Sequence, residues 1–143
     1  QWAEAVAAAR PFGSPANLLA SALAANQNLS TADWLEAFAG HPRIGDKAAL
    51  AKKFASTSTW ATAEQAGVLA ASEVVVAELA RLNDEYERKF GHVFLICATG
   101  KSADEMLNAL KSRIGNDARV ELEKAAAEQA KITQLRLERI LAT

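Results

Sequence analysis

One of the two histidines of this chain, His41, stands in the stretch GHPRIGDK, residues 40–47. A residue that precedes proline is kept out of the helical region, so Pro42 holds the backbone of His41 extended and fixes the direction of its side chain. An oriented imidazole is what acid and base chemistry near neutral pH requires. The alternative is a polar residue just past a helix end, where the imidazole meets the carbonyl end of the helix dipole. Spacing alone favours this alternative, and Pro42 shifts the balance toward the first interpretation.

A second candidate is Glu64, which Gln65 follows near the start of a long helical pattern. Glu64 lies four residues before Val68 and so leads into an apolar stripe that continues through Val75 and Leu79. A glutamate near a helix N-terminus often only complements the helix dipole. On the apolar side of a helix, however, a carboxylate needs either a partner or a function.

A third candidate is Arg136, four residues from both Ile132 and Ile140 in the last helical pattern. This spacing puts a guanidinium on an apolar stripe. Such an arginine is often an ion-pair partner, for which Glu64 is the candidate here, but its planar fork equally matches the carboxylate of an anionic ligand. By themselves these residues predict a helical domain in which one histidine, one glutamate and one arginine converge.

Metal chemistry has almost no support in the sequence. No second His, Cys or carboxylate stands at a ligand spacing such as HExxH from either histidine, and no metal site is predicted. His92 follows a glycine beside apolar residues and is interpreted as structural. Cys97 lies in the apolar run VFLIC and is interpreted as a small buried residue. Because it is the only cysteine, no disulfide can form within the chain.

The composition indicates one globular domain covering residues 1–143. Half of the residues are apolar, but no apolar run approaches the roughly eighteen residues of a membrane span, so we expect a soluble protein. The net charge of -1, without a local Lys/Arg cluster, argues against nucleic acid as a partner. The chain begins at Gln1 without a charged-then-apolar leader, and the expected location is cytoplasmic.

Abundant alanine and apolar residues repeated every three or four positions predict an all-α fold, a bundle of about seven or eight helices. Val93 to Cys97 is the one strand-like run, and without a partner strand it is interpreted as a buried extended connection or a turn of helix. The predicted helices cover Trp2 to Ala9, Pro15 to Asn26 after Ser14, Ser30 or Thr31 to Gly40, Asp46 to Phe54, Trp60 to Lys89 with a break near Ser72, Ser102 to Arg113, and Asn116 to the C-terminus.

Five stretches of the sequence together resemble one known family. They are ARPF (9–12), HPRIGDK (41–47), WATAEQAG (60–67), LNDEYERKFGHVFLICATG (82–100) and KITQLRLERIL (131–141). In this order they are similar to the 2-oxo-4-hydroxy-4-carboxy-5-ureidoimidazoline (OHCU) decarboxylases, over nearly the whole chain. The HPRIGD and Y-x-x-x-FG-x-x-F elements are specific as a combination and weak singly.

The resemblance implies an all-helical enzyme of urate breakdown that uses no cofactor and forms (S)-allantoin and CO2, as a homodimer. It implies that His41 is the catalytic acid/base, and that Glu64 acts at the reacting centre and, with Gln65, hydrogen-bonds the substrate. Arg136 would bind polar or anionic atoms of the substrate. The remaining pocket residues implied by the resemblance are Pro42, Phe90, Gly91, Phe94 and Ile96.

Two departures from the family pattern affect these expectations. Ala61 stands where the family usually has serine, which removes one hydrogen bond, and about twenty residues that usually precede the first tryptophan are not seen before Trp2. Two other functions stay open: a non-catalytic helical module that binds a carboxylate, and a hydrolase that uses Glu64 to activate water. A peroxisomal location is the alternative if a signal followed Thr143.

Overall fold

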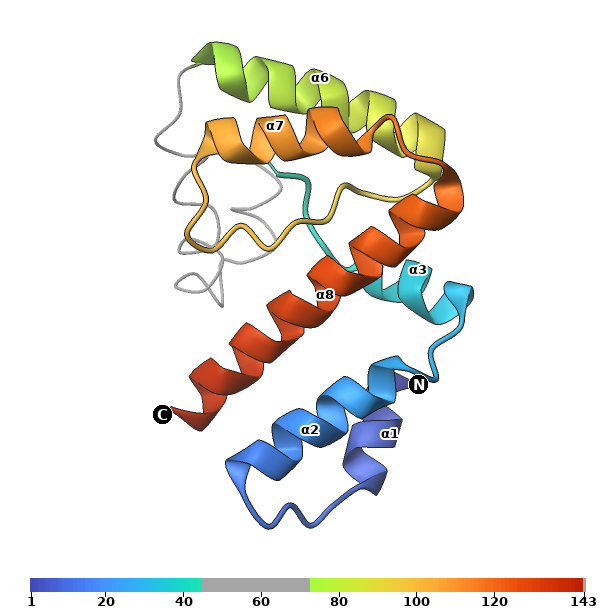
Figure 1. The fold of residues 1–143 in the computed structure, drawn as a ribbon, viewed down its shortest axis with the longest axis vertical. Helices are drawn as coiled ribbons and strands as arrows, with labels where there is room; N and C mark the ends of the chain where they lie inside the picture. The colour runs from blue at the N-terminus through green and yellow to red at the C-terminus, as the bar shows by residue number, and fades with distance from the viewer. Residues whose placement is uncertain (45–72, 143) are drawn as a thin grey trace.

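The computed structural model describes residues 1–44 and 73–142, and within them the secondary structure is entirely helical (Figure 1). This confirms the predicted all-α class. The predicted helix from Asp46 and the first part of the one from Trp60 lie outside the described residues. No described helix combines the length and the apolar character that crossing a membrane requires. The helices are α1 (Trp2–Ala8), α2 (Pro15–Asn26), α3 (Thr31–Ala39), α6 (Glu73–Phe90), α7 (Ala103–Arg113) and α8 (Ala118–Leu141).

Local capping chemistry sets where the N-terminal helices begin. The Ser14 hydroxyl accepts a hydrogen bond from the backbone N–H of Asn17 at 3.2 Å, directly before Pro15 at the first position of α2. Ser30 and Asp33 form a reciprocal capping box at the start of α3, and the hydrogen bonds from Ser30 lower the pKa of the Asp33 carboxyl. Both predicted starts are confirmed.

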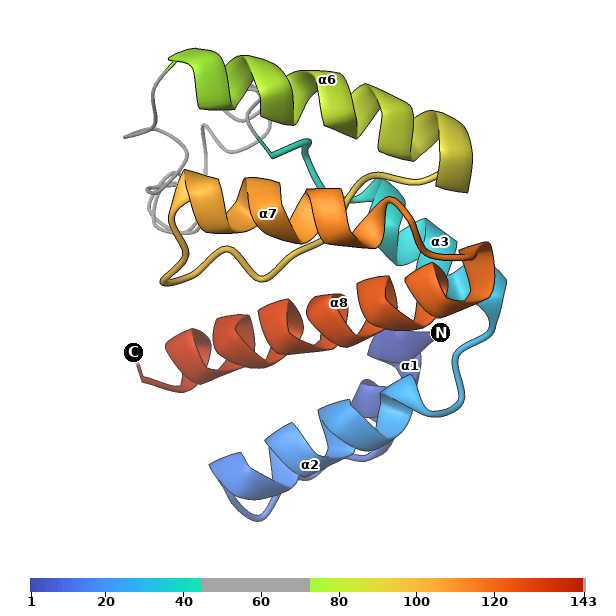
Figure 2. The same cartoon turned by 45° about the horizontal axis from the view of Figure 1, so that its top comes forward.

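Helices α6 and α7 lie side by side and run in the same direction, so the chain must return between them (Figures 1 and 2). The 18 residues of α6 span about 27 Å at 1.5 Å per residue, and roughly eight extended residues at about 3.3 Å each cover such a distance. Gly91 ends α6, because its φ of 76° is left-handed and cannot continue the helix. Glycine adopts this conformation without the strain that a Cβ would cause. A second capping box, Ser102 with Glu105, starts α7.

The returning segment, residues 93–98, is buried on both faces. Phe94, Ile96 and Ala98 enter a cluster with residues of α6 and α7, whereas Leu95 and Cys97 enter a cluster with residues of α3 and α8. Alternate side chains of an extended chain point in opposite directions, which explains why the run is apolar throughout. The interpretation as a buried extended connection is confirmed.

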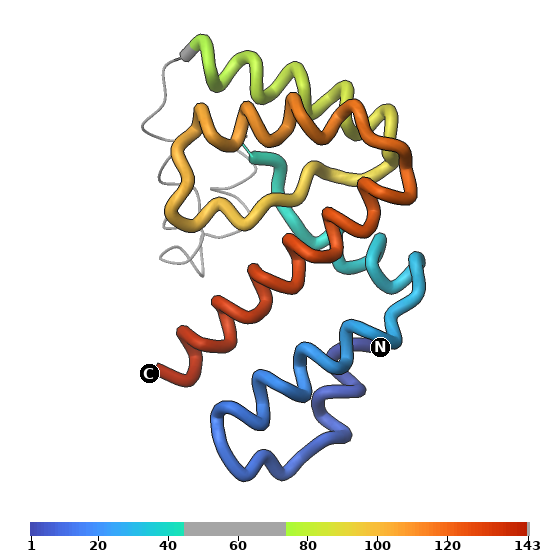
Figure 3. The backbone as a smooth tube through the Cα atoms, in the orientation of Figure 1, coloured from blue at the N-terminus to red at the C-terminus, as the bar shows by residue number. Residues whose placement is uncertain are grey.

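Helix α8 crosses the molecule between two layers, with α6 and α7 on one side and the α1–α2 pair on the other (Figures 1 and 3). Its N-cap is Asp117, whose carboxylate accepts from the backbone N–H of Val120 at 2.9 Å, and the helix begins at Ala118. The predicted start at Asn116 was wrong by two residues, because Asp117 is the side chain that reaches the first turn while Asn116 turns its amide to Glu121.

Candidate functional site

The loop that carries His41 begins where α3 ends. The His41 N–H donates to the carbonyl of Phe38 at 3.0 Å, and the His41 and Pro42 side chains are half-buried. Gly40 caps α3 as predicted, with a right-handed φ of -71°, so a left-handed conformation is not the reason for glycine at this position. Glycine is favoured here by a close approach instead, since a Cβ on Gly40 would lie 3.1 Å from the carbonyl oxygen of Ala37.

Two residues after His41, the loop is fastened to α6. The guanidinium of Arg43 donates to both carboxylate oxygens of Glu87, at 2.6 and 2.8 Å, and also pairs with Asp84. The hydrogen bonds to Glu87 raise the pKa of Arg43 above its already high value. The next residue, Ile44, is buried, and its carbonyl accepts from the amide of Asn83 at 3.3 Å.

Sequence reasoning missed this attachment. The available signal was an arginine two positions after the candidate histidine, together with two acidic residues three apart, Asp84 and Glu87, on one face of a helix. Nothing local shows that these groups meet, since Arg43 and Glu87 are 44 positions apart in the chain.

At the end of α6, Phe90 is half-buried and Gly91 is exposed, and His92 follows in an aromatic cluster. The His92 ring lies 5.0 Å from the ring of Phe38 and 5.5 Å from that of Tyr86, between centroids, and Nδ1 lies 3.0 Å from the carbonyl oxygen of Val93. These contacts agree with the structural interpretation of His92.

The predicted pocket residues Phe94 and Ile96 have their side chains in the core. Phe94 is 1 % exposed, packs edge-on against Tyr86 and carries the guanidinium of Arg113 over its ring, 4.5 Å from the centroid. Ile96 is 6 % exposed in the same cluster. The structure thus gives both side chains a packing role, and their contact with substrate stays a prediction.

A buried polar network holds the returning segment from the α6–α7 side. Glu121, which is fully buried, accepts from the Tyr86 hydroxyl at 2.5 Å, from Nε and Nη2 of Arg113 at 2.9 and 2.5 Å, and from the amide of Asn116 at 2.9 Å. Nη1 of Arg113 donates to the carbonyl of Leu95 at 2.6 Å. Burial, followed by the hydrogen bond to the Glu121 carboxylate, raises the pKa of Tyr86.

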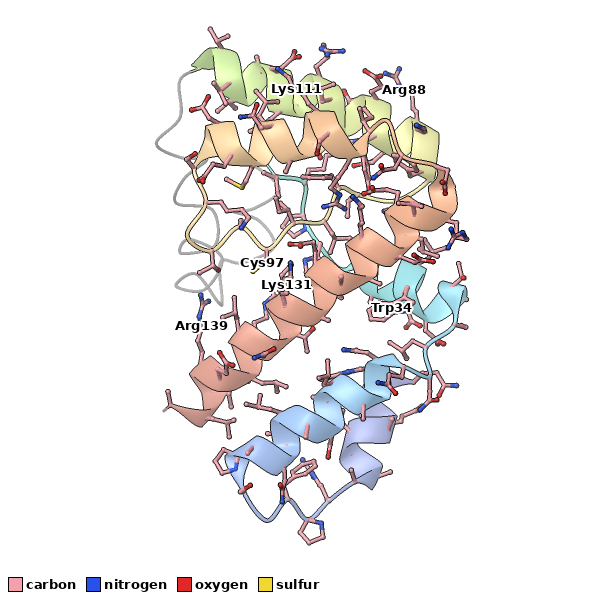
Figure 4. The ribbon with its side chains drawn as sticks, viewed as in Figure 1. Trp34, Arg88, Cys97, Lys111, Lys131 and Arg139 are labelled. Atoms are coloured by element: carbon pink, nitrogen blue, oxygen red, sulfur yellow. The ribbon has the colours of Figure 1, made fainter. Side chains whose placement is uncertain are left out.

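On the α8 side, Glu128 binds the same segment. Its carboxylate accepts from the backbone N–H of Cys97 at 2.7 Å and from Lys131 at 2.6 Å. Burial tends to raise the pKa of Glu128, but the hydrogen bonds from Lys131 and from the Cys97 N–H outweigh it and the pKa is lowered. An extended segment without a partner strand thus has backbone groups satisfied by side chains. Figure 4 shows Cys97 and Lys131 near the middle of α8 and Arg139 closer to its C-terminal end.

Arg136 is half-buried on α8. Ile132 is 6 % exposed but Ile140 is 54 % exposed, so the apolar stripe proposed on both sides of Arg136 exists only on its N-terminal side. The predicted stripe was wrong at Ile140, because the last turns of α8 extend toward the C-terminus beyond the buried cluster around Ile132.

Glu64, Gln65 and Ala61 lie outside the described residues, so the convergence of histidine, glutamate and arginine stays a prediction. Within residues 1–44 and 73–142, no group of three His, Cys, Asp or Glu side chains is arranged to hold a metal ion. A hollow of about 380 Å³ is lined mainly by residues of α1, α3 and α8, and one of about 500 Å³ lies between α2 and α8. Neither has His41 or Arg136 among its described lining residues, and so neither is assigned to the candidate site.

Comparison with known proteins identifies the family. The family model described as OHCU decarboxylase matches residues 1–138. The chain is 44 % identical over 115 residues to the uric acid degradation bifunctional protein TTL of Arabidopsis thaliana, a match that covers 78 % of this chain and 35 % of that protein. It is 39 % identical over 77 residues to the OHCU decarboxylase of Amia calva, covering 54 % of this chain and 44 % of that protein.

A solved structure is similar over almost the full length of the chain. The crystal structure of an OHCU decarboxylase in the presence of (S)-allantoin aligns with a TM-score of 0.83 and 35 % identity, covering 99 % of this chain and 91 % of that one. The chain spans less than half the length of the plant and Amia calva relatives that it matches. The match of the family model over residues 1–138, with this structural likeness, shows that the chain belongs to the OHCU decarboxylase family.

Proposed function

We propose that this chain converts 2-oxo-4-hydroxy-4-carboxy-5-ureidoimidazoline to (S)-allantoin and CO2. The observation that carries the proposal is the likeness, over 99 % of the chain, to an OHCU decarboxylase solved in the presence of (S)-allantoin. The bifunctional relatives are named for uric acid degradation, the process to which this reaction belongs. The proposed catalytic unit is a single domain, residues 1–143.

The chemistry of the substrate explains why the protein needs few groups. When the bond to the carboxylate breaks and CO2 leaves, the electron pair forms a carbon–carbon double bond and displaces the electrons of the adjacent C=N bond onto nitrogen, which takes up a proton. The electron sink is inside the substrate, so the reaction requires no resident cofactor. The protein must orient the substrate, move protons and present one face of the product.

His41 is the proposed acid/base in this scheme. It accepts the proton of the 4-hydroxyl group as the enol intermediate collapses to a ketone, and protonation of the ureido-bearing carbon from one face sets the S configuration. The half-buried position of His41 beside Pro42 supports this role, because an acid/base group must be positioned by the protein and still be accessible to a ligand.

Substrate contacts are proposed for the family positions. Glu64 and Gln65 bind the ureido and ring groups, with Glu64 closest to the reacting centre, and Arg136 binds the departing carboxylate or another polar group. Pro42, together with the segment from Phe90 to Ile96 that includes Gly91 and Phe94, forms the pocket wall. Because Phe94 and Ile96 turn into the core, backbone groups are the part of that segment best suited to reach a ligand.

The test uses substrate made freshly from urate by an oxidase and a hydrolase, with CO2 release and circular dichroism recorded together. Unassisted decay protonates a planar enol from both faces and yields racemic allantoin, whereas the enzyme is expected to yield the S form. The His41→Asn variant is expected to lower turnover about 10²- to 10⁴-fold without loss of helicity. Racemic product at the uncatalysed rate would instead support a carboxylate-binding module, and ammonia release would support a hydrolase.

The proposed assembly is a homodimer, which light scattering coupled to size-exclusion chromatography can test. A monomer that retains full turnover would remove the dimer from the proposal and leave the reaction in place.

A further inference from the structure

We propose that Arg43, held by Glu87, is a positioning residue that sets the orientation of His41. This inference rests on the proposed function, in which His41 is the acid/base. The three residues from His41 to Arg43 form a short, stiff unit, because Pro42 has a fixed φ and restricts the residue before it. Whatever holds Arg43 in place therefore also limits the directions that the imidazole can take.

The loop is attached at both ends of this unit. On one side the His41 N–H binds the Phe38 carbonyl at 3.0 Å at the end of α3. On the other, Arg43 makes its two-point contact with Glu87, at 2.6 and 2.8 Å, on α6. A two-point guanidinium–carboxylate contact fixes direction as well as distance, which a single hydrogen bond does not.

Asn83 reinforces the attachment one residue further on. Its amide donates to the carbonyl of Ile44 at 3.3 Å and to that of Leu79 at 2.8 Å, in a fully buried position on α6. The two carbonyls as acceptors fix which end of the amide faces them. The chain thus leaves α3 at His41 and is attached to α6 by the side chain of Arg43 and by the backbone carbonyl of Ile44.

The position of the Arg43 pair favours a positional role over a stabilising one. The side chains of Arg43 and Asp84 are 38 % and 56 % exposed, and that of Glu87 is 26 % exposed. Exposed pairs are screened by water and add little to stability. A small displacement of a catalytic group, however, can lower a rate about a hundredfold, so the same contact can have a large effect on turnover.

Helix α6 offers a matched control for this inference. Arg81 makes two contacts with Glu78, at 2.9 and 3.0 Å, and one with Glu85 at 3.2 Å, and none of these contacts involves the described residues 40–44 of the His41 loop. Arg81→Ala thus removes an arginine that pairs with carboxylates of the same helix, α6, and leaves the contact between Arg43 and Glu87 in place. Glu87→Gln changes the partner of Arg43 instead: it removes the negative charge and keeps the size of the side chain, and it serves as the second test variant.

The first measurement is the NMR spectrum of the imidazole protons, which does not depend on activity. The chain has only two histidines, so the His41→Asn variant assigns both resonances. Arg43→Ala and Glu87→Gln are expected to shift or broaden the His41 resonance and to leave that of His92 in place, and Arg81→Ala is expected to move neither. An unchanged His41 resonance in folded Arg43→Ala would overturn the inference, as would an equal response to Arg81→Ala.

The second measurement is turnover of freshly made substrate. Arg43→Ala is expected to lower kcat about 10- to 100-fold with a much smaller change in KM, Glu87→Gln to lower it in the same sense, and Arg81→Ala to leave it at the wild-type value. If Arg43→Ala does not fold, Glu87→Gln decides the question. A wild-type chain without turnover contradicts the proposed function, whereas wild-type turnover that requires His41 but not Arg43 or Glu87 contradicts this inference alone.

Discussion

Most of the described candidate residues lie in two segments, the returning segment and the His41 loop. An arginine–glutamate pair holds each segment, and the two pairs differ in burial. Arg113 and Glu121 hold the returning segment and have side chains 9 % and 0 % exposed. Arg43 and Glu87 hold the His41 loop and have side chains 38 % and 26 % exposed. Both contacts join a guanidinium to a carboxylate, although Arg113 donates twice to one oxygen of Glu121 and Arg43 donates to both oxygens of Glu87. The larger difference between the two pairs is their exposure to solvent.

Burial decides which property of the protein each pair controls. A buried charge without its partner is costly, so the Arg113–Glu121 pair is tied to folding itself. A partly exposed charge is hydrated when its partner is removed, so the Arg43–Glu87 pair is tied to the placement of a loop. The comparison predicts that changes in the first pair affect stability and that changes in the second affect turnover.

The largest effect is expected from Glu121→Ala, which leaves the Arg113 guanidinium buried and removes the acceptor of Tyr86 and Asn116. We expect the free energy of unfolding in urea to fall by about 3–5 kcal/mol. Replacing both charges, as Arg113→Met with Glu121→Leu, should recover part of this loss, because no unpaired buried charge remains. A loss for Glu121→Ala no greater than that for Arg43→Ala would contradict the role given to burial.

A smaller effect is expected at alkaline pH from Tyr86, the only tyrosine of the chain. The folded pKa of Tyr86 is raised above the ordinary value of 10.0, so its stabilising contribution is complete below about pH 10 and is lost as the pH rises toward the folded pKa. Above pH 10 we expect the loss of this contribution from Tyr86 to reduce the free energy of unfolding by at most about 1.4 kcal/mol per pH unit.

Two measurements check this expectation. Phenolate absorbance should not appear at pH 10 in the folded protein and should accompany unfolding at higher pH. The Tyr86→Phe variant lacks the ionising group, so its stability should decline less steeply over the same range. Phenolate formation near pH 10 with the fold intact would show that the network does not hold the proton.

The smallest effect on stability is expected from Arg43→Ala. Because its side chain is more than a third exposed, solvent screening should limit the change in the free energy of unfolding to about 1 kcal/mol or less. Urea unfolding of this variant beside Glu121→Ala tests the comparison directly. A loss of several kcal/mol would make Arg43 a folding residue, and any drop in its turnover would then have a different origin.

Much of the fold could be predicted because the relevant signals are local. Ser14 and Ser30 mark the starts of α2 and α3, Ser102 with Glu105 marks that of α7, and Gly91 ends α6. Each of these side chains acts within three residues of itself, or through its own φ angle. The error at the start of α8 has the same origin, since Asn116 and Asp117 are adjacent residues that can both cap a helix.

The candidate site could be predicted only in part. The motifs HPRIGDK and FGHVF predict which two segments carry candidate residues, but not which side chains of the second turn into the core. The exposure of Ile140 could not be predicted either, because a helical stripe shows which residues share a face and not where the neighbouring layer ends.

The sequence by itself determined the helical class, the caps that start α2, α3 and α7, the apolar run that becomes the returning segment and the family to which the chain belongs. Only the tertiary structure decided which charges meet. With 16 basic and 17 acidic residues, many pairings are compatible with the same pattern of helices. The packing of the His41 loop and of α8 against the other elements brings distant residues to hydrogen-bonding distance, Arg43 to Glu87 and Tyr86 to Glu121, because such a contact depends on separation in space and not along the chain.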